Sequence, residues 1–187
     1  MQTPKLYMLM LGCTPAGRNT EQHDVFFSIA NSVKELVPEI KAFWLEAKGE
    51  IHVDAWREVT QVNGYKITVV PKEAAENNAE SAKLFFLNLG GYKPAEFDEF
   101  HYKMLAVAQN SAGAIKQAKE TAFYKHTGFK GATSHIDDKF GVDVDDLHKV
   151  QDILPASAKQ KYSLQITAAQ AEAEDEMHLG YFQLHKL

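Results

Sequence analysis

The sequence has only one cysteine, Cys13, so the chain cannot form an internal disulfide. It also lacks an apolar run long enough to cross a membrane, and it lacks the basic segment and cleavage pattern that direct secretion. Its lysines and arginines are not clustered among aromatic residues, and its formal net charge is −5. We therefore expect a cytoplasmic protein that has neither a membrane nor a nucleic acid as its partner.

Familiar catalytic signatures are absent as well. The chain contains no Gly-x-Ser-x-Gly elbow, no His-Glu-x-x-His, no Cys-x-x-Cys and no Gly-x-Gly-x-x-Gly. With 187 residues, of which 45% are hydrophobic, it can bury a core without a metal ion or a disulfide. The sequence leaves the cofactor, if there is one, unknown.

The chain does contain an internal repeat. Residues 5–12, KLYMLMLG, are echoed by residues 83–90, KLFFLNLG. The same offset carries His23 onto His101, and it likewise carries Glu21 onto Glu99. With small insertions in the second copy, the block VDAWREV that begins at Val53 corresponds to VDDLHKV, which begins at Val144. The chain is therefore interpreted as a duplicated module.

This repeat predicts a division of the chain into four parts. The first repeat covers 1–71, a polar linker 72–82, the second repeat 83–168, and a C-terminal extension packed on the core 169–187. The second copy is longer, chiefly between Lys125 and Val142, and insertions of this kind usually form loops.

Each copy is predicted to begin with a strand, at 6–11 and at 84–89, because continuous apolar runs suit a strand that is covered on both faces. A helix should follow each strand, capped by Thr20 in the first copy and by Asp98 in the second, since apolar residues then recur at helical spacing. A second strand is expected after each helix, at 42–47 in the first copy and at 122–125 in the second.

The Val-Asp blocks space their apolar residues by three, which indicates short helices capped by Asp54 and Asp145. A final strand should follow in each copy, at 65–70, after the Asn63-Gly64 turn, and at 162–167. The predicted fold class is therefore α/β, with two tandem β-α-β-α-β repeats related by a pseudo-twofold axis. The sheet should be parallel or mixed, with helices packed on it.

The loop after the first strand, 12–24, is where chemistry is expected, because ligands of open α/β sheets bind beyond the carboxyl ends of the strands. It combines Gly17 and Arg18 with the predicted helix N-terminus, whose free amides favour anions. A small anionic ligand is the expected partner. The alternative is a glycine-bearing turn with a solvated arginine. The loop also resembles a nucleotide phosphate loop, but Arg18 replaces the lysine and Asn19 replaces the hydroxyl residue.

His23 and Glu21 would lie in the first turn of the predicted helix. The helix end would keep the imidazole neutral and available as a general acid or base. The alternative is structural, with the histidine fixing the loop and the glutamate complementing the helix dipole.

A metal site is a further alternative. His52 and Asp54 form a His-x-Asp pair, and with His23 they would supply two histidines and a carboxylate, a set used by metal-dependent hydrolases and oxygenases. The repeat, however, aligns His52 with Asp143 and makes Asp54 a helix cap. Glu21 and His23 cannot share an ion in a regular helix, because positions two apart point to different faces. No metal ligand is therefore assigned.

Two other features leave alternatives open. His135 and Asp137 form a second His-x-Asp pair that could chelate a cation. Cys13 could be a nucleophile activated by His23, or it could be a small buried apolar residue.

The first strand, the following Gly-Cys-Thr-Pro-Ala-Gly-Arg, the helix entrance from Glu21 to Phe27 and the Val-Asp block resemble a bacterial family, the domain of unknown function 1543 family. The resemblance covers nearly the whole chain and implies two copies of the module in one chain. It assigns no roles but points to five matching polar positions, Arg18, Glu21, Gln22, His23 and Asp54. In the second copy Phe100 replaces Gln22, which puts a second equivalent site in doubt.

The preferred function is the binding or processing of a small anionic metabolite. His23 and Glu21 would be catalytic, whereas the ligand would be bound by Arg18, Gly17, Gln22 and Asp54. The first alternative is a non-catalytic binding or interaction module, and the second is a metal-dependent hydrolase. The sequence leaves the oligomeric state open, with a homodimer among the alternatives.

Overall fold

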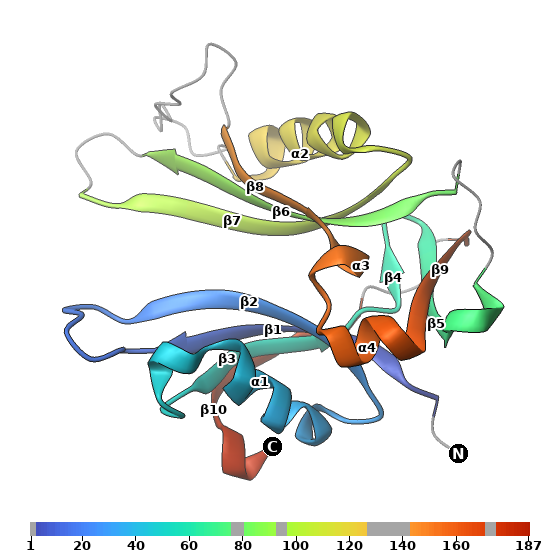
Figure 1. Cartoon of the computed structure of the whole chain (residues 1–187). Helices are drawn as coiled ribbons and strands as arrows, with labels where there is room; N and C mark the ends of the chain where they lie inside the picture. The colour runs from blue at the N-terminus through green and yellow to red at the C-terminus, as the bar shows by residue number, and fades with distance from the viewer. Residues whose placement is uncertain (1–2, 76–80, 93–96, 127–142, 171–174) are drawn as a thin grey trace. The chain divides into compact units, whose positions relative to one another are not determined.

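The computed structural model describes residues 3–75, 81–92, 97–126, 143–170 and 175–187 (Figure 1). The chain divides into two compact units. The first unit consists of two separate stretches, Met1–Asn77 and Ile153–Leu187, and the second unit is the intervening stretch Asn78–Asp152. The second unit is therefore an insertion in the sequence of the first.

The main sheet of the first unit has four antiparallel strands in the order β10-β3-β1-β2. These strands are β1 (Lys5–Cys13), β2 (Gln22–Ala30), β3 (His52–Glu58) and β10 (His178–Gln183). Strands β1 and β2 form a hairpin that pairs Lys5 with Ala30 at one end and Cys13 with Gln22 at the other.

A smaller antiparallel sheet in the same unit has the order β4-β5-β9. Its strands are β4 (Gln61–Val62), β5 (Tyr65–Pro71) and β9 (Tyr162–Ala168). The turn between β4 and β5 has positive φ at both Asn63 (51°) and Gly64 (78°), as a two-residue hairpin turn of type I′ requires.

One face of the four-stranded sheet packs against α1 (Figure 1). Tyr7, Leu9 and Leu11 of β1 share a buried core with Ile40 of α1 and with Leu184 near the C-terminus. Apart from one longer helix in the second unit, the described helical elements are short. They are η1 (Val33–Leu36), α1 (Val37–Phe43), η2 (Leu45–Ala47), η3 (Lys72–Ala74), α3 (Val150–Ile153), α4 (Ala156–Lys161) and η4 (Leu184–Lys186).

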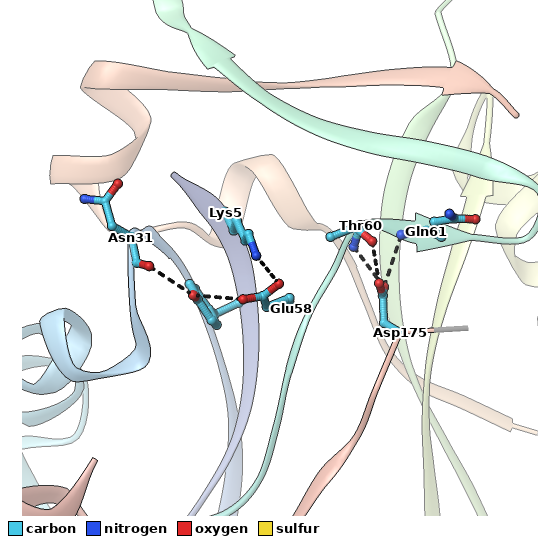
Figure 2. Close-up of polar contacts among 7 residues, drawn as sticks. Lys5, Asn31, Glu58, Thr60, Gln61 and Asp175 are labelled. Atoms are coloured by element: carbon cyan, nitrogen blue, oxygen red, sulfur yellow. Dashed lines mark hydrogen bonds and ion pairs between the residues drawn. The ribbon is translucent and has the colours of Figure 1, made fainter. Parts of the chain in front are cut away.

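Two carboxylates tie segments of the first unit that are distant in sequence (Figure 2). Glu58 accepts a hydrogen bond of 2.5 Å from Lys5 Nζ and one of 3.3 Å from the hydroxyl of Tyr7. Burial, followed by the charge of Glu58, raises the pKa of Tyr7 to about 12. Asp175 accepts hydrogen bonds from the backbone N–H groups of Thr60 (2.8 Å) and Gln61 (3.1 Å), and from the Thr60 hydroxyl.

The second unit has a three-stranded antiparallel sheet in the order β7-β6-β8, with one helix on it (Figure 1). Its elements are β6 (Lys83–Tyr92), β7 (Glu99–Ala108), α2 (Ser111–His126) and β8 (Asp143–Lys149). Leu87 of β6 shares a buried core with Ala114 and Ala118 of α2. Asn110 caps the helix, because its Oδ1 accepts a 3.0 Å hydrogen bond from the backbone N–H of Gly113.

The helices predicted after the first strand of each copy are wrong, because those segments are the strands β2 and β7. In β2 the successive residues Phe26 and Phe27 are 2% and 1% exposed, so the strand is buried on both faces. A strand of this kind has a continuous apolar run with no alternation, and a helical period can be fitted to it by chance. Thr20 and Asp98 therefore cap no helix.

The short helices predicted at the Val-Asp blocks are also wrong, since these blocks form β3 and β8. Asp54 and Asp145 are strand residues and not caps. The strands expected at 42–47 and 122–125 lie instead in helical segments, around α1 and η2 in the first case and in α2 in the second.

These differences overturn the predicted parallel or mixed α/β fold, because the three sheets are antiparallel and the consecutive strands β1–β2, β4–β5 and β6–β7 pair with each other. The strands predicted at 6–11, 84–89, 65–70 and 162–167 are confirmed, and the last two pair with each other. His135 and Asp137 lie outside the described residues, and the repeat boundaries stay predictions. Among the described helices, none is both long and apolar enough to cross a membrane.

Candidate metal centre

Three neighbouring strands of the first unit bring two histidines to one glycine. Gly12 on β1 is directly opposite His23 on β2 and directly opposite His52 on β3. Residues that are paired in this way project from the same face of a sheet. The neighbours of Gly12, Leu11 and Cys13, belong to the core that contains α1, so both histidines project from the opposite face.

A β-bulge adds a carboxylate to this group. Met10 pairs with Ala55 and Leu11 pairs with Val53, which leaves Asp54 as the extra residue on β3. Bulges of this type redirect a side chain. A Cβ atom on Gly12 would lie 2.5 Å from Asp54 Oδ2 and would also collide with the His52 imidazole. The space above Gly12 is therefore filled by two side chains of the site, and only glycine fits beneath them.

Glu21, the residue before β2, completes the cluster. Its Oε1 lies 2.8 Å from His52 Nε2, and its Oε2 lies 3.8 Å from His23 Nε2. Asp54 contacts the same two nitrogens, with Oδ1 3.2 Å from His52 Nε2 and Oδ2 3.3 Å from His23 Nε2. Each carboxylate thus faces both imidazoles. We call Glu21, His23, His52 and Asp54 the first-unit cluster.

The cluster is buried on one side and open on the other. The side chain of His52 is only 10% exposed, whereas those of Glu21 and His23 are 43% and 42% exposed. Asp54 Oδ2 is buried and accepts no hydrogen bond from any described residue, because its approach to His23 does not have hydrogen-bond geometry. Such a buried oxygen is costly unless another group satisfies it.

Strand β10 supports the buried histidine. The ring of Tyr181 packs on the His52 imidazole with a centroid separation of 4.3 Å and an interplanar angle of 33°. The pairing of β10 with β3 shifts register between Leu179 and Phe182, where Gly180 has a φ of 147°. This irregularity lies beside the Asp54 bulge, so both strands depart from regular pairing at the site.

The donor types suit a divalent transition-metal ion, and three of the nitrogen-to-oxygen separations are in the range expected for two donors that share one ion. Imidazole nitrogen and carboxylate oxygen together are typical ligands of zinc, iron, nickel and manganese. Two donors bound at about 2.1 Å lie about 3.4 Å apart around a tetrahedral ion and about 3.0 Å apart when adjacent around an octahedral one. Three of the four contacts measure 2.8–3.3 Å, and the fourth 3.8 Å. Protonated histidines paired with the carboxylates are the competing arrangement.

The structure brings together three of the six predicted site residues, Glu21, His23 and Asp54. The other three lie outside the cluster, Gly17 and Arg18 in the loop and Gln22 at the start of β2. Gly17 is an exposed turn residue with a φ of 82°, and the backbone N–H of Arg18 donates to Pro15 O at 3.1 Å. The side chain of Gln22 donates to the backbone carbonyl oxygens of Thr20 and Glu21. The catalytic and binding roles given to all six residues stay predictions.

The sequence interpretation set His52 aside as incidental, although it is the most buried member of the cluster. The error follows from the predicted period. Positions two apart diverge on a helix but share a face on a strand, so the His-x-Asp and Glu-x-His spacings both favour convergence once the segments are strands. The sequence signal that could have indicated the site is Gly12, which aligns with Gly90 in the repeat, because a glycine at this position leaves room for the side chains above it.

The helix N-terminus expected to bind an anion does not exist, because β2 occupies that segment. Cys13 is 1% exposed and belongs to the core with α1. Burial raises the pKa of its thiol, and the charges of Glu50 and Glu21 raise it further. These surroundings disfavour the thiolate that a nucleophilic mechanism needs.

Comparisons with known proteins support the family resemblance and the fold. Residues 18–69, which contain the first-unit cluster, match the family described as Domain of Unknown Function (DUF1543). Protein Il1583 from Idiomarina loihiensis is similar in structure, with a TM-score of 0.63 and 22% sequence identity over 97% of this chain and 98% of that one. No curated protein matched the chain. At this identity the similarity shows a shared fold and nothing about activity.

Proposed function

We propose that the first unit binds a divalent transition-metal ion through Glu21, His23, His52 and Asp54. The observation that carries the proposal is the convergence of two imidazole nitrogens and two carboxylates, with contacts of 2.8–3.8 Å, above a glycine that leaves room for them. A cation there would also satisfy the buried Oδ2 of Asp54.

The chemistry that best fits such an ion is hydrolysis of a small anionic metabolite. A metal ion supplies positive charge and can lower the pKa of a bound water to about 7. The exposed sides of Glu21 and His23 leave the cluster open to solvent and to a substrate. This proposal combines two of the predicted functions, the processing of an anionic metabolite and the metal-dependent hydrolase. The anion would be attracted by the metal ion and not by a helix end. A metal-dependent binding module without turnover is the alternative.

Titration of chelator-stripped protein with Zn²⁺, Co²⁺ and Mn²⁺ in a calorimeter tests the proposal. Wild-type protein should bind Zn²⁺ at the cluster, and His52→Ala should lose that binding event, because one imidazole ligand is gone. His185→Ala is a matched control, since His185 is exposed in η4 and lies outside the cluster. Binding should weaken in acidic buffer, where protons compete with the metal for the imidazoles.

Absorption spectra of the Co²⁺-loaded protein give a second readout, because ligand fields differ between bound and free ion. The proposal is wrong if no metal binds with a dissociation constant below about 1 mM. It is also wrong if the His52→Ala and His185→Ala variants give the same titration curve. Activity toward phosphate or carboxylate esters would then have no metal basis in this unit.

A further inference from the structure

We infer that the second unit holds a separate cation site of its own, formed by Glu99, His101 and Asp145. One donor atom from each of these side chains lies within 4.8 Å of the others. His101 Nε2 is 3.8 Å from Glu99 Oε2 and 3.3 Å from Asp145 Oδ2. We call these three residues the second-unit cluster. All three belong to the second unit, so this site stands or fails separately from the first.

The backbone that presents this cluster has the same features as that of the first unit. Gly90 on β6 is directly opposite His101 on β7. The pairing of β6 with β8 shifts register between Asn88 and Leu89, which leaves Asp145 as the bulged residue. A Cβ on Gly90 would lie 2.9 Å from Asp145 Oδ1, so the carboxylate occupies the space above the glycine. A glycine, a strand histidine and a bulged aspartate therefore recur together.

The contact distances recur as well. The His101–Asp145 separation of 3.3 Å equals the His23–Asp54 separation. The Glu99–His101 separation of 3.8 Å equals the Glu21–His23 separation. Isolated surface ion pairs would not be expected to keep the same separations, because exposed pairs are held weakly. A constraint on the backbone accounts for the match, and that constraint places three donors around one point.

The donor sets differ in one respect that sets the chemical class of the cation. Gly90 pairs with Asp143 at the position where Gly12 pairs with His52, so the second imidazole is missing. One imidazole and two carboxylates form an oxygen-rich set, which suits Mn²⁺ or Mg²⁺ better than a set with two imidazoles does. The second-unit cluster should therefore bind Zn²⁺ less tightly than the first and should discriminate less between Zn²⁺ and Mn²⁺.

Titration of chelator-stripped full-length protein with Mn²⁺ and Zn²⁺ tests this inference, with free Mn²⁺ followed by electron paramagnetic resonance. Wild type should bind two ions per chain. His101→Ala should bind one ion, at the first-unit cluster, and His52→Ala should bind one ion, at the second-unit cluster. The ratio of Zn²⁺ affinity to Mn²⁺ affinity should be at least tenfold smaller in His52→Ala than in His101→Ala. His148→Ala on β8 is the matched control and should still bind two.

The outcomes separate the two sites. One ion per wild-type chain, retained in full by His101→Ala, would overturn the second site and leave the first intact. Loss of an ion in His101→Ala with none lost in His52→Ala would support the second site and overturn the first. Circular dichroism of each variant shows whether it is folded. If His101→Ala is not folded, Glu99→Gln, which keeps the size of the side chain, repeats the test.

Discussion

At the scale of single residues, the first-unit cluster depends on Gly12. It contributes no ligand, yet its missing side chain leaves the space that the His52 imidazole and the Asp54 carboxylate occupy. Its φ is not in the left-handed region, so its role is steric and not conformational. The repeat shows this residue and Gly90 as strand ends, but only the paired strands show what lies above them.

Gly12→Ala should weaken Zn²⁺ binding at the first-unit cluster by about tenfold or more, because the new methyl group displaces two proposed ligands. The free energy of unfolding should fall by about 1–3 kcal/mol, the usual cost of overpacking. Calorimetric titration and chemical denaturation measure the two effects.

Gly90→Ala provides the control for that substitution. It makes the same chemical change but displaces only Asp145 in the other unit, so Zn²⁺ binding at the first-unit cluster should be unaffected. Equal loss at that cluster in the two variants would show that the effect of Gly12→Ala is not local.

At the scale of elements, the site depends on strands that sequence patterns describe poorly. Strand β2 is buried on both faces from Phe26 to Ala30, so it has no alternation that distinguishes it from a helix. Strand β3 contains a bulge, which breaks the two-residue period at Asp54 and makes a spacing of three appear. By contrast, the Asn63-Gly64 turn depends only on local chain chemistry, and its prediction is confirmed.

Asp175→Ala should lower the free energy of unfolding by about 1–3 kcal/mol, because it removes the carboxylate that accepts hydrogen bonds from the backbone N–H groups of Thr60 and Gln61 (Figure 2). Urea denaturation followed by circular dichroism measures the change. Glu176→Ala is the control, since the Glu176 side chain is 82% exposed, and it should change the stability by less than about 0.5 kcal/mol. Equal stability of the two variants would mean that the Asp175 hydrogen bonds contribute nothing.

At the scale of the whole molecule, the first unit is built from both ends of the chain. Strand β10 pairs with β3, and Leu184 is buried in the core with residues of β1 and α1. The first unit therefore cannot be complete until the residues after the second unit have been made. The predicted repeat boundaries rest on sequence similarity alone and stay predictions.

Leu184→Ala should lower the free energy of unfolding by about 2–5 kcal/mol, because it leaves a cavity in the core of the first unit. Leu179→Ala makes the same change at a position that is 72% exposed, and it should have little effect. Chemical denaturation of both variants gives the comparison. A small effect of Leu184→Ala would show that the C-terminal segment is not part of the cooperative core.

The sequence by itself determined the strands that open each copy and the Asn63-Gly64 hairpin, and it singled out Glu21, His23 and Asp54 as candidate site residues, because continuous apolar runs, turn residues and recurring polar positions are local signals. Only the tertiary structure decided the antiparallel pairing, the bulges and the place of His52. Strand register depends on which distant segments lie side by side, and a change from helix to strand reverses which neighbours share a face.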